Sequence, residues 1–320
     1  MKTAVILVNL GTPATTDVKD IRRFLRQFLS DQRVVELPRL IWYPILYGII
    51  LPFRARRLQE PYSELWQDGE SPLRRYSLSI VDQLQQHYGE QLSVHLAMTY
   101  GKPSIAEVLD RCQHNAVERI LVLPMYPQYS ATTTAAVFDQ IAHHYLERRS
   151  IPQWQMLSDY YREPLYIEGL ANTVRKHWQE HGKGERLLVS FHGIPKRCVD
   201  LGDPYFEQCQ ATAQALARVL ELDESDWQIS FQSRLGKAEW LKPYTDKVLE
   251  QLGAEGVKTL DVICPAFATE CLETLDEIAI EGQEQFAEAG GGELRYVPCL
   301  NDNPDQLNLL RHLIEKNLGL

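Results

Sequence analysis

One histidine near the middle of the chain stands where its side chain has room to act. His192 follows the apolar segment Leu187–Phe191 directly and precedes Gly193. An imidazole at the end of a buried strand faces the mouth of a cleft, and its ordinary pKa of about 6.5 lets it take up protons or bind a metal. The structural alternative is a histidine that only hydrogen-bonds a neighbouring loop, and position alone leaves both interpretations open.

A series of glutamates towards the C-terminus forms the second set of reactive side chains. Glu273, Glu277 and Glu281 are spaced i, i+4, i+8, so on an α-helix they share one face. Like charges at this spacing disfavour a helix unless they are solvated, or share protons or a cation. A solvated face is the ordinary explanation, and a line of acids that conducts metal ions or protons is the alternative.

Both sets of residues need strands and helices to position them, and the hydrophobic pattern supplies these. Short apolar segments typical of strands are 4–8, 93–97, 119–123, 153–157, 187–191, 228–231, 259–263 and 294–298. Segments with helical periodicity lie between them and include 17–29, 104–115, 132–147, 163–181 and 205–220. Strands that alternate with helices predict βαβ units and parallel sheets.

The eight strands fall into two sets of four, which predicts an α/β protein of two similar Rossmann-like domains. Each domain is expected to hold a four-stranded parallel sheet flanked by helices, with the active-site cleft between the domains. We place the N-terminal domain at 1–155, including an apolar lip at about 40–53, and the C-terminal domain at 156–302. A helix within 303–320 is expected to pack back on the first domain.

The unusual residues of the chain follow the expected strands. Ligands of open parallel sheets bind beyond the carboxyl ends of the strands, so these residues should converge on one site. They are Asn9–Pro13, Thr99–Gly101, Tyr126–Ser130, His192–Pro195, Gln232–Gly236 and Cys264–Phe267.

The lip, LIWYPILYGIILPF, is apolar almost throughout, but Pro44 and Gly48 interrupt it. Spanning a bilayer takes roughly 20 apolar residues, so the segment is too short to cross one. It is either a buried helix or an exposed surface that contacts a membrane or a hydrophobic substrate. In the second case Trp42, Ile45 and Leu46 are the residues expected to make the contact.

Composition excludes several classes of protein. The formal net charge of -10 argues against nucleic acid as a partner, because phosphate binding needs a basic surface. The chain contains no GxGxxG, GxSxG or Walker A motif, which argues against common dinucleotide, hydrolase and NTPase sites.

The apolar segment at 4–8 leads into Gly-Thr-Pro, which favours a strand over a signal peptide. Six cysteines form neither a CxxC pair nor a zinc spacing, as in a cytoplasmic protein with reduced thiols.

Six stretches, in this order, resemble the ferrochelatase family. They are VNLGTP, QFLSDQRVVELPRLIWYPIL, YPQYSATTT, SFHGIP, FQSRLGKAEWLKPYTD and CPAFATECLETLDEI. The resemblance runs from the first strand to the last helix and is to the Gram-negative bacterial type without an iron–sulfur cluster. It implies a metal chelatase, or lyase, that inserts Fe²⁺ into protoporphyrin IX to form protohaem, the last step of haem biosynthesis.

The resemblance also implies roles for single residues. His192 and Glu273 correspond to the family's catalytic and metal-handling residues, and Glu277 and Glu281 continue from them as a metal or proton conduit. Contacts to the porphyrin would come from Leu10, Arg54, Tyr62, Ser71, Tyr100, Tyr129 and Trp240. The lip resembles the family's lip, which admits the porphyrin and rests on a membrane. The substrates would be a porphyrin and ferrous iron, with no organic cofactor.

Three positions depart from the family pattern. Cys271 stands where some relatives carry a histidine, so that role does not transfer. Thr99 stands where certain relatives carry an arginine. Cys299 is the last cysteine, and the tail after it has none, so we expect no iron–sulfur cluster.

Metal insertion requires that two pyrrole protons leave and that the metal loses its other ligands. A cleft that grips the macrocycle from both faces would bind it saddled and expose its nitrogen lone pairs. His192 and Glu273 each suit the role of base or of metal ligand near neutral pH, so the sequence does not divide the work between them.

Two other functions fit the same residues. One is a chelatase for another porphyrin or metal, such as coproporphyrin or cobalt, and the other is a non-catalytic porphyrin or haem carrier. The expected location is the cytoplasm, with peripheral contact at the inner face of the cell membrane through the lip. The lip would serve equally as a dimer surface, so both a monomer and a homodimer remain open.

Overall fold

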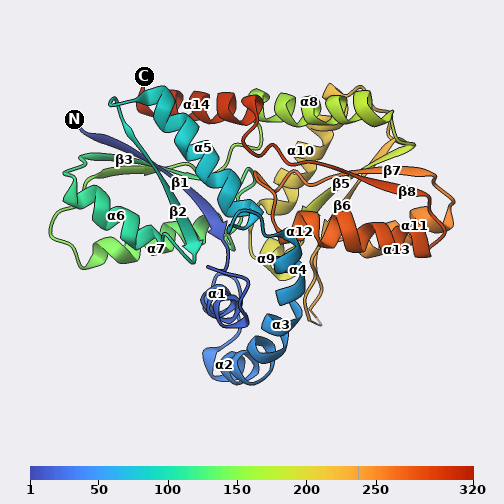
Figure 1. Cartoon of the computed structure of the whole chain (residues 1–320), viewed down its shortest axis with the longest axis horizontal. Helices are drawn as coiled ribbons and strands as arrows, with labels where there is room; N and C mark the ends of the chain where they lie inside the picture. The colour runs from blue at the N-terminus through green and yellow to red at the C-terminus, as the bar shows by residue number, and fades with distance from the viewer. Residues whose placement is uncertain (237) are drawn as a thin grey trace. The chain divides into compact units, whose positions relative to one another are not determined.

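In the part of the chain that the structure describes, eight strands form two four-stranded sheets in which every pair of neighbours is parallel. The computed structural model describes residues 1–236 and 238–320, and Figure 1 shows the order of their helices and strands. The chain divides into two units, which we describe separately. Unit 1 comprises Met1–Tyr126, Ser130–Asp159 and Leu310–Leu320, and unit 2 comprises Pro127–Tyr129 and Tyr160–Leu309. The expected α/β fold with two parallel sheets is confirmed.

The sheet of unit 1 has the order β2-β1-β3-β4. Its strands are β1 (Thr3–Gly11), β2 (Ser93–Tyr100), β3 (Arg119–Pro124) and β4 (Gln153–Met156). The central strand β1 is buried from Ala4 to Asn9, because helices cover both faces of a parallel sheet. It extends beyond the expected 4–8, since its ladder with β2 continues through polar Asn9 to Gly11.

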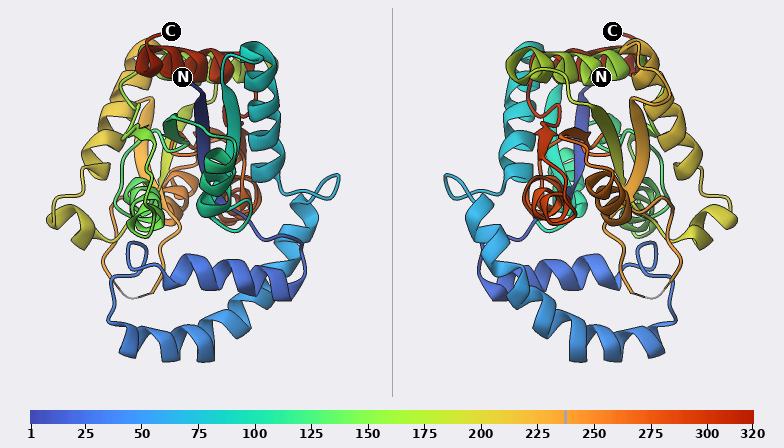
Figure 2. Two further views of the ribbon diagram at one scale, coloured as in Figure 1. Left: turned by 90° about the vertical axis from the view of Figure 1, so that its left-hand side faces the viewer. Right: turned by 90° about the vertical axis from the view of Figure 1, so that its right-hand side faces the viewer.

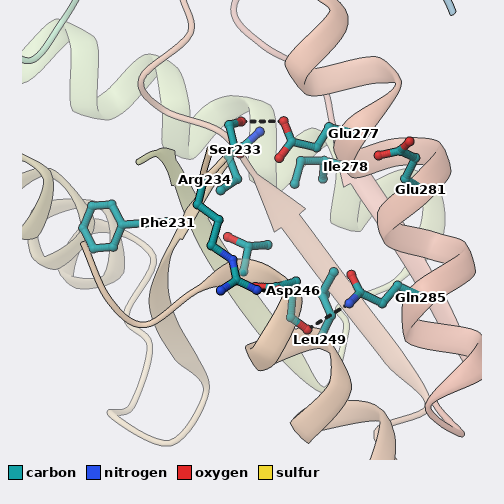
Figure 3. Close-up of a pocket in the computed structure, with 11 residues that line it drawn as sticks. Phe231, Ser233, Arg234, Asp246, Leu249, Glu277, Ile278, Glu281 and Gln285 are labelled. Atoms are coloured by element: carbon teal, nitrogen blue, oxygen red, sulfur yellow. Dashed lines mark hydrogen bonds and ion pairs between the residues drawn. The ribbon is translucent and has the colours of Figure 1, made fainter. Parts of the chain in front are cut away.

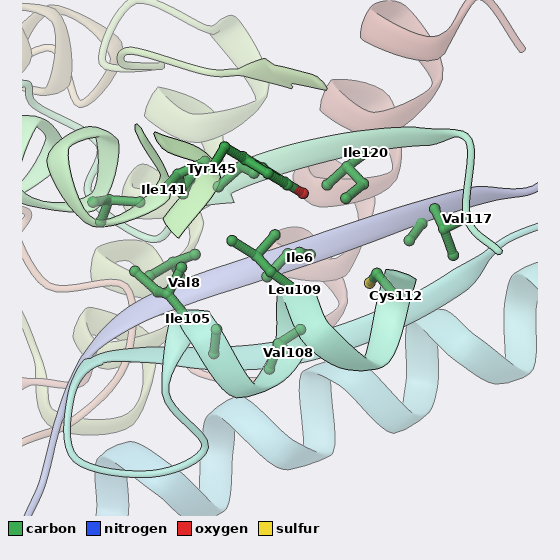
Figure 4. Close-up of a cluster of buried hydrophobic side chains, with 14 of the residues drawn as sticks. Ile6, Val8, Ile105, Val108, Leu109, Cys112, Val117, Ile120, Ile141 and Tyr145 are labelled. Atoms are coloured by element: carbon green, nitrogen blue, oxygen red, sulfur yellow. The ribbon is translucent and has the colours of Figure 1, made fainter. Parts of the chain in front are cut away.

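Helices of unit 1 supply the apolar side chains that cover its sheet. They are α1 (Val18–Ser30), α2 (Arg39–Ile45), the π-helix η1 (Leu46–Ile50), α3 (Leu51–Arg57), α4 (Gln59–Leu65), α5 (Pro72–Tyr88), α6 (Ile105–His114) and α7 (Thr134–Leu146). Figure 4 shows the core on one face, where Ile6 and Val8 of β1 meet Val108 and Leu109 of α6 and Ile141 of α7.

The last helix, α14 (Pro304–Leu318), ends within unit 1. The guanidinium of Arg119 on β3 donates to the carbonyl oxygens of Asn317 and Leu318, each at 3.0 Å. These carbonyls lie at the helix end, where no intrahelical donor remains, so the arginine both satisfies them and complements the negative end of the helix dipole.

The lip is a helical arm made of α2, η1 and α3, and both views of Figure 2 show it lying against α1. Trp42 and Leu46 point inward and are 7% and 0% exposed, and the indole of Trp42 donates to the carbonyl of Leu29 at 2.6 Å. Leu40 and Phe53 are 93% and 70% exposed. The segment is therefore an amphipathic arm, and our choice of Trp42 and Leu46 as its outer residues was wrong.

None of the helices in the described part of the chain has the length and apolar character needed to cross a bilayer.

The sheet of unit 2 has the order β6-β5-β7-β8. Its strands are β5 (Arg186–His192), β6 (Trp227–Gln232), β7 (Thr259–Ile263) and β8 (Glu293–Val297), so all eight expected strands are present. Its helices are α8 (Pro164–His181), α9 (Lys196–Asp200), α10 (Tyr205–Val219), α11 (Thr245–Ala254), α12 (Leu272–Leu275), the π-helix η2 (Glu277–Gly282) and α13 (Gln283–Glu288).

A buried carboxylate on β7 holds together the end of unit 2 opposite the carboxyl ends of its strands. Asp261 is 1% exposed and pairs with the guanidinium of Arg295 on β8 at 2.7 Å. It also accepts hydrogen bonds from the indole of Trp178 at 2.7 Å and from the backbone of Gly184 at 2.9 Å. Arg295 in turn donates to the carbonyl of His181 at the end of α8, so one ion pair joins two strands and a helix.

Removing the charge of Asp261 should therefore destabilise unit 2. An Asp261→Asn variant leaves the nearly buried Arg295 without its counter-charge, and we expect the free energy of unfolding to fall by about 3 kcal/mol in urea titrations. The control is Glu168→Gln, which breaks an exposed pair with Arg175 and should cost less than about 1 kcal/mol. Equal losses in the two variants would contradict the assignment.

Candidate active site

His192 is the last residue of β5, where its backbone is held from two sides. The hydroxyl of Tyr205 donates to its carbonyl at 2.9 Å, and the next amide, of Gly193, donates to the carbonyl of Gln232 on β6 at 2.8 Å. The imidazole meets the ring of Phe267 edge-on, with 6.3 Å between the ring centres.

The contacts of the imidazole assign its tautomer. Nδ1 of His192 lies 2.7 Å from the carbonyl oxygen of Gly193. A carbonyl oxygen only accepts, so Nδ1 carries the hydrogen. In the neutral ring the lone pair is then on Nε2, which is the nitrogen available to take a proton or to bind a metal.

Trp240 lies beside the residue that follows His192. A Cβ added to Gly193 would come within 3.3 Å of Cε3 of Trp240 and 2.7 Å of the Gln232 carbonyl oxygen, so only glycine fits between them. The indole nitrogen of Trp240 donates to the carbonyl of Leu235 at 2.9 Å. The structure thus brings two residues from the sequence prediction, His192 and Trp240, into one neighbourhood.

The glutamates are carried by two short helical segments that follow one another, α12 and η2, rather than by one α-helix. Glu273 lies on the single turn of α12, and Glu277 begins the π-helix η2, in which the amide of Glu281 donates to the carbonyl of Asp276 at 2.9 Å. A π-helix has more residues per turn than an α-helix. Residues four apart, such as Glu277 and Glu281, therefore lie closer to one line along its axis.

A cavity of about 260 Å³ opens beside this acid line, between the end of β6, α11 and the π-helix. Figure 3 shows Glu277 and Glu281 on one side of it and Ser233 and Arg234 on the other. Its lining residues are Phe231, Gln232, Ser233, Arg234, Thr245, Asp246, Leu249, Glu277, Ile278, Glu281 and Gln285. Arg234 is paired with Asp246, and the hydroxyl of Ser233 donates to the carboxylate of Glu277.

The pKa of Glu277 shows that its neighbours form one electrostatic group. Burial raises this pKa above its usual value, and the charge of Glu273 raises it further. The Ser233 hydrogen bond and the charge of His192 act in the opposite direction. His192 and Glu273 are thus both close enough to act on the carboxylate of Glu277, and all three residues belong to unit 2.

Cys271, which departs from the family pattern, is a buried neighbour of Glu273. Burial raises the pKa of its thiol well above the ordinary value, and the charge of Glu273 together with a hydrogen bond to that carboxylate adds to the shift. The sulfur therefore stays protonated and acts as a weak hydrogen-bond donor. Its backbone amide donates to the hydroxyl of Thr274 at the start of α12.

Two of the expected porphyrin contacts already have polar partners in unit 1. Ser71 is 2% exposed and its hydroxyl caps α5, where it accepts from the amide of Arg74. The hydroxyl of Tyr100 donates to Asp31 at 2.8 Å.

The remaining expected contacts differ in burial. In unit 1, Tyr62 is buried with its ring against Trp66, Arg54 is half-buried on α3, and Leu10 is half-buried against the core. In unit 2, Tyr129 is half-buried, and its amide donates to the side chain of Gln208 at 2.7 Å.

Across residues 1–236 and 238–320 no three His, Cys, Asp or Glu side chains are grouped so that they would hold a metal ion. The arrangement in unit 2 instead offers one imidazole nitrogen and a few carboxylates. Such a set suits protons and metal ions that pass through more than a metal that stays.

Comparison with known proteins decides which chemistry this geometry serves. The family model for ferrochelatase matches residues 2–318. The chain belongs to the ferrochelatase family. A ferrochelatase from Methylococcus capsulatus is 47% identical over 319 residues, which cover 100% of this chain and 98% of that protein. Ferrochelatases from Aeromonas hydrophila and Vibrio cholerae are each 48% identical and cover 99% and 98% of this chain, with the same shares of their own lengths.

Solved structures agree on the fold. SirB from Bacillus subtilis with Fe³⁺ has a TM-score of 0.58 at 14% identity, covering 98% of this chain and 95% of that one. CbiX, described as the terminal enzyme of sirohaem biosynthesis in denitrifying bacteria, has a TM-score of 0.52 at 16% identity, covering 98% of both chains. At these identities the likeness establishes a shared chelatase fold.

As a ferrochelatase, the chain is a metal chelatase that inserts Fe²⁺ into protoporphyrin IX to form protohaem. Fe²⁺ and the porphyrin are its substrates. The sequence analysis gave no individual role to Ser233, the hydrogen-bond partner of Glu277, or to Tyr205, which donates to the carbonyl of His192. Position was their only signal, since Ser233 directly follows β6 and Tyr205 begins α10.

Loss of the Ser233 hydroxyl should shift the pH dependence of activity. Its hydrogen bond stabilises ionised Glu277, so Ser233→Ala should raise the pKa of Glu277 further above its usual value. If ionised Glu277 takes part in activity, the acidic limb of kcat/KM for Fe²⁺ moves to higher pH, while the plateau is kept. Ser225→Ala, which alters an exposed serine, is the matched control, and superimposable profiles for all three proteins would contradict the role of Ser233.

Proposed function

We propose that His192 and Glu273 form the centre at which Fe²⁺ replaces the two pyrrole protons of protoporphyrin IX. The observation that carries this proposal is the hydrogen bond from Nδ1 of His192 to the carbonyl of Gly193, which leaves the Nε2 lone pair available. The carboxylates of Glu273 and Glu277 lie within electrostatic reach of one another, and that of Glu277 also lies within reach of the imidazole.

In this proposal Nε2 is the base. Each pyrrole N–H bond breaks with its electron pair left on nitrogen, and Nε2 takes the proton. The imidazolium that forms is stabilised by the nearby negative charge and by the carbonyl that Nδ1 faces. The proton then passes along Glu277 and Glu281 to solvent, so His192 returns to its neutral form before the second proton leaves.

In this proposal Glu273 handles the metal ion, while His192 handles the protons. Its carboxylate attracts Fe²⁺ while the porphyrin nitrogens replace the ligands that the ion brings with it. An oxygen ligand and a single imidazole hold Fe²⁺ less firmly than a set of thiolates would, so the ion is free to transfer.

The assignment of the centre is tested by removing its two groups. We expect His192→Ala and Glu273→Gln to lower kcat by at least about 100-fold in an anaerobic assay that follows the absorbance of protoporphyrin IX after Fe²⁺ is added. Glu284→Gln changes an exposed glutamate on α13 and should keep full turnover. Full turnover in both His192→Ala and Glu273→Gln would overturn the proposed centre.

We also propose that the chain works without an iron–sulfur cluster or an organic cofactor. Its support is geometric, since in residues 1–236 and 238–320 no three cysteine, histidine or carboxylate side chains are grouped so that they would hold a metal ion.

We further propose that the lip rests on the inner face of the cell membrane. Its support is the row of exposed apolar side chains on the arm, among them Leu40, Ile41, Ile49 and Phe53, at 93%, 59%, 58% and 70% exposure. Arginines 54, 56 and 57 end α3 beside Phe53 and complement anionic headgroups.

Exposed lip residues are the ones to change in a membrane test. A variant with Leu40, Ile41 and Phe53 all changed to Ser should lose most of its co-sedimentation with anionic liposomes, because each change removes apolar area from the contact. Leu146→Ser, 79% exposed on unit 1 outside the lip, should bind as before. Unchanged binding by the triple variant would refute membrane contact, and conversion of a dimer to a monomer would assign the lip to self-association instead.

A further inference from the structure

Gln232 is the last residue of β6 and lies between the two halves of the proposed centre. The residue is only 3% exposed although its side chain ends in an amide. A buried amide needs partners for both its oxygen and its nitrogen. The backbone and the side chain of this residue reach different parts of unit 2, and each contact involves the neighbourhood of His192 or Glu273.

The backbone of Gln232 faces the histidine. Gln232 and His192 are partners in the β5–β6 ladder, and the carbonyl of Gln232 accepts from the amide of Gly193 at 2.8 Å. Gly193 is the residue whose own carbonyl accepts from Nδ1 of His192. The position of Gln232 therefore bears directly on the peptide that orients the imidazole.

The side chain of Gln232 faces the acid line. Its Nε2 donates to the backbone carbonyl of Glu273 at 2.7 Å. Its Oε1 accepts from the hydroxyl of Ser190 on β5 at 2.8 Å and faces the thiol of Cys264, after β7, at 3.5 Å. Two donors at the oxygen and one acceptor at the nitrogen leave the amide one orientation.

Only an amide of this length satisfies all of these partners. A carboxylate would place an oxygen against the carbonyl of Glu273, and an apolar side chain would remove the donor to that carbonyl and leave the Ser190 hydroxyl with Thr245 as its remaining partner. The helix that carries Glu273 is a single turn and runs into a π-helix, so few contacts within the helix fix its position.

We infer that Gln232 is a positioning residue for metal insertion, one that sets the carboxylate of Glu273 relative to the imidazole of His192. The inference rests on the proposed function of these two residues. Gln232 itself touches neither the metal nor the porphyrin in this role: it acts through two backbone groups, the carbonyl of Glu273 and the amide of Gly193.

Two variants of Gln232 test the inference. Gln232→Met keeps the length but removes the amide, and Gln232→Glu keeps the oxygen that faces Ser190 but loses the donor to Glu273. We expect each to lower kcat by about 10- to 100-fold, because small displacements of a catalytic group have effects of this size. The KM for protoporphyrin IX should stay within about twofold of the wild-type value. If Gln232→Met does not fold, Gln232→Glu alone still tests the inference.

A control separates positioning from the general loss of a buried amide. Gln85 is half-buried in unit 1, and its amide donates to the carbonyls of Gly89 and Leu92 and accepts from the amide of Val94, so it is a glutamine with a full set of partners away from the carboxyl ends of the strands. Gln85→Met should lower the unfolding temperature, as Gln232→Met does, yet keep its kcat.

Combination with a Glu273 variant shows through which residue Gln232 acts. In a Glu273→Asp background the carboxylate is already displaced by one methylene, so adding Gln232→Met should lower kcat by less than about threefold. Losses that multiply would mean that Gln232 acts independently of Glu273 and would overturn the inference, as would wild-type kcat in folded Gln232→Met and Gln232→Glu. Failure of the proposed centre is a different result, because it requires that Glu273→Gln keep full turnover.

Discussion

In unit 2, β5 is hydrogen-bonded on one side to β6 and on the other to β7, and all three strands run the same way. This parallel pairing places three chain segments at one edge of the sheet. The first begins with His192, the second with Gln232 and Ser233, and the third leads from β7 to the helix of Glu273. A change in the register of β5 against β6 would separate the imidazole from the residues that orient it, so the proposed centre depends on the ladder as much as on its own side chains.

Charge and burial are balanced differently at the two ends of this sheet. At the end opposite the centre, Asp261 is fully enclosed and its charge is matched by Arg295, which makes a rigid junction. At the carboxyl ends of the strands, the partly buried Glu277 has a hydroxyl donor and a histidine nearby, and its pKa is raised. A carboxylate with a raised pKa exchanges protons more readily near neutral pH, which is the property that a relay needs.

Local pattern was enough to predict the strands and the main catalytic candidates. Apolar segments bounded by polar residues marked β7 at the expected residues, Thr259–Ile263, and His192 was found because it ends such a segment. Resemblance to a family then connected His192 with Glu273, which lies 81 positions later in the chain. No periodicity links two residues so far apart.

Contacts set by tertiary packing were beyond the sequence. The lip is apolar on both its faces, so composition did not reveal that Trp42 turns inward to the carbonyl of Leu29 while Leu40 stays exposed. The amide of Gln232 was visible only as one polar residue after a strand, because its partners come from β5, β7 and α12. Spacing of the glutamates predicted one α-helix, whereas the structure has a π-helical segment within the series.

Because of that π-helical segment, the number of residues in the helix affects which side chains line the cavity. A π-helix is in effect an α-helix with one residue added, and residues Glu277–Gly282 accommodate it. Deleting a single residue there would remove that added residue and let the segment close to an α-helix, so α13 would keep its orientation. The change would fall on the segment itself, because a deletion between Glu277 and Glu281 would leave them three residues apart instead of four. The wall of the cavity therefore depends on the length of this segment more than the helix that follows it does.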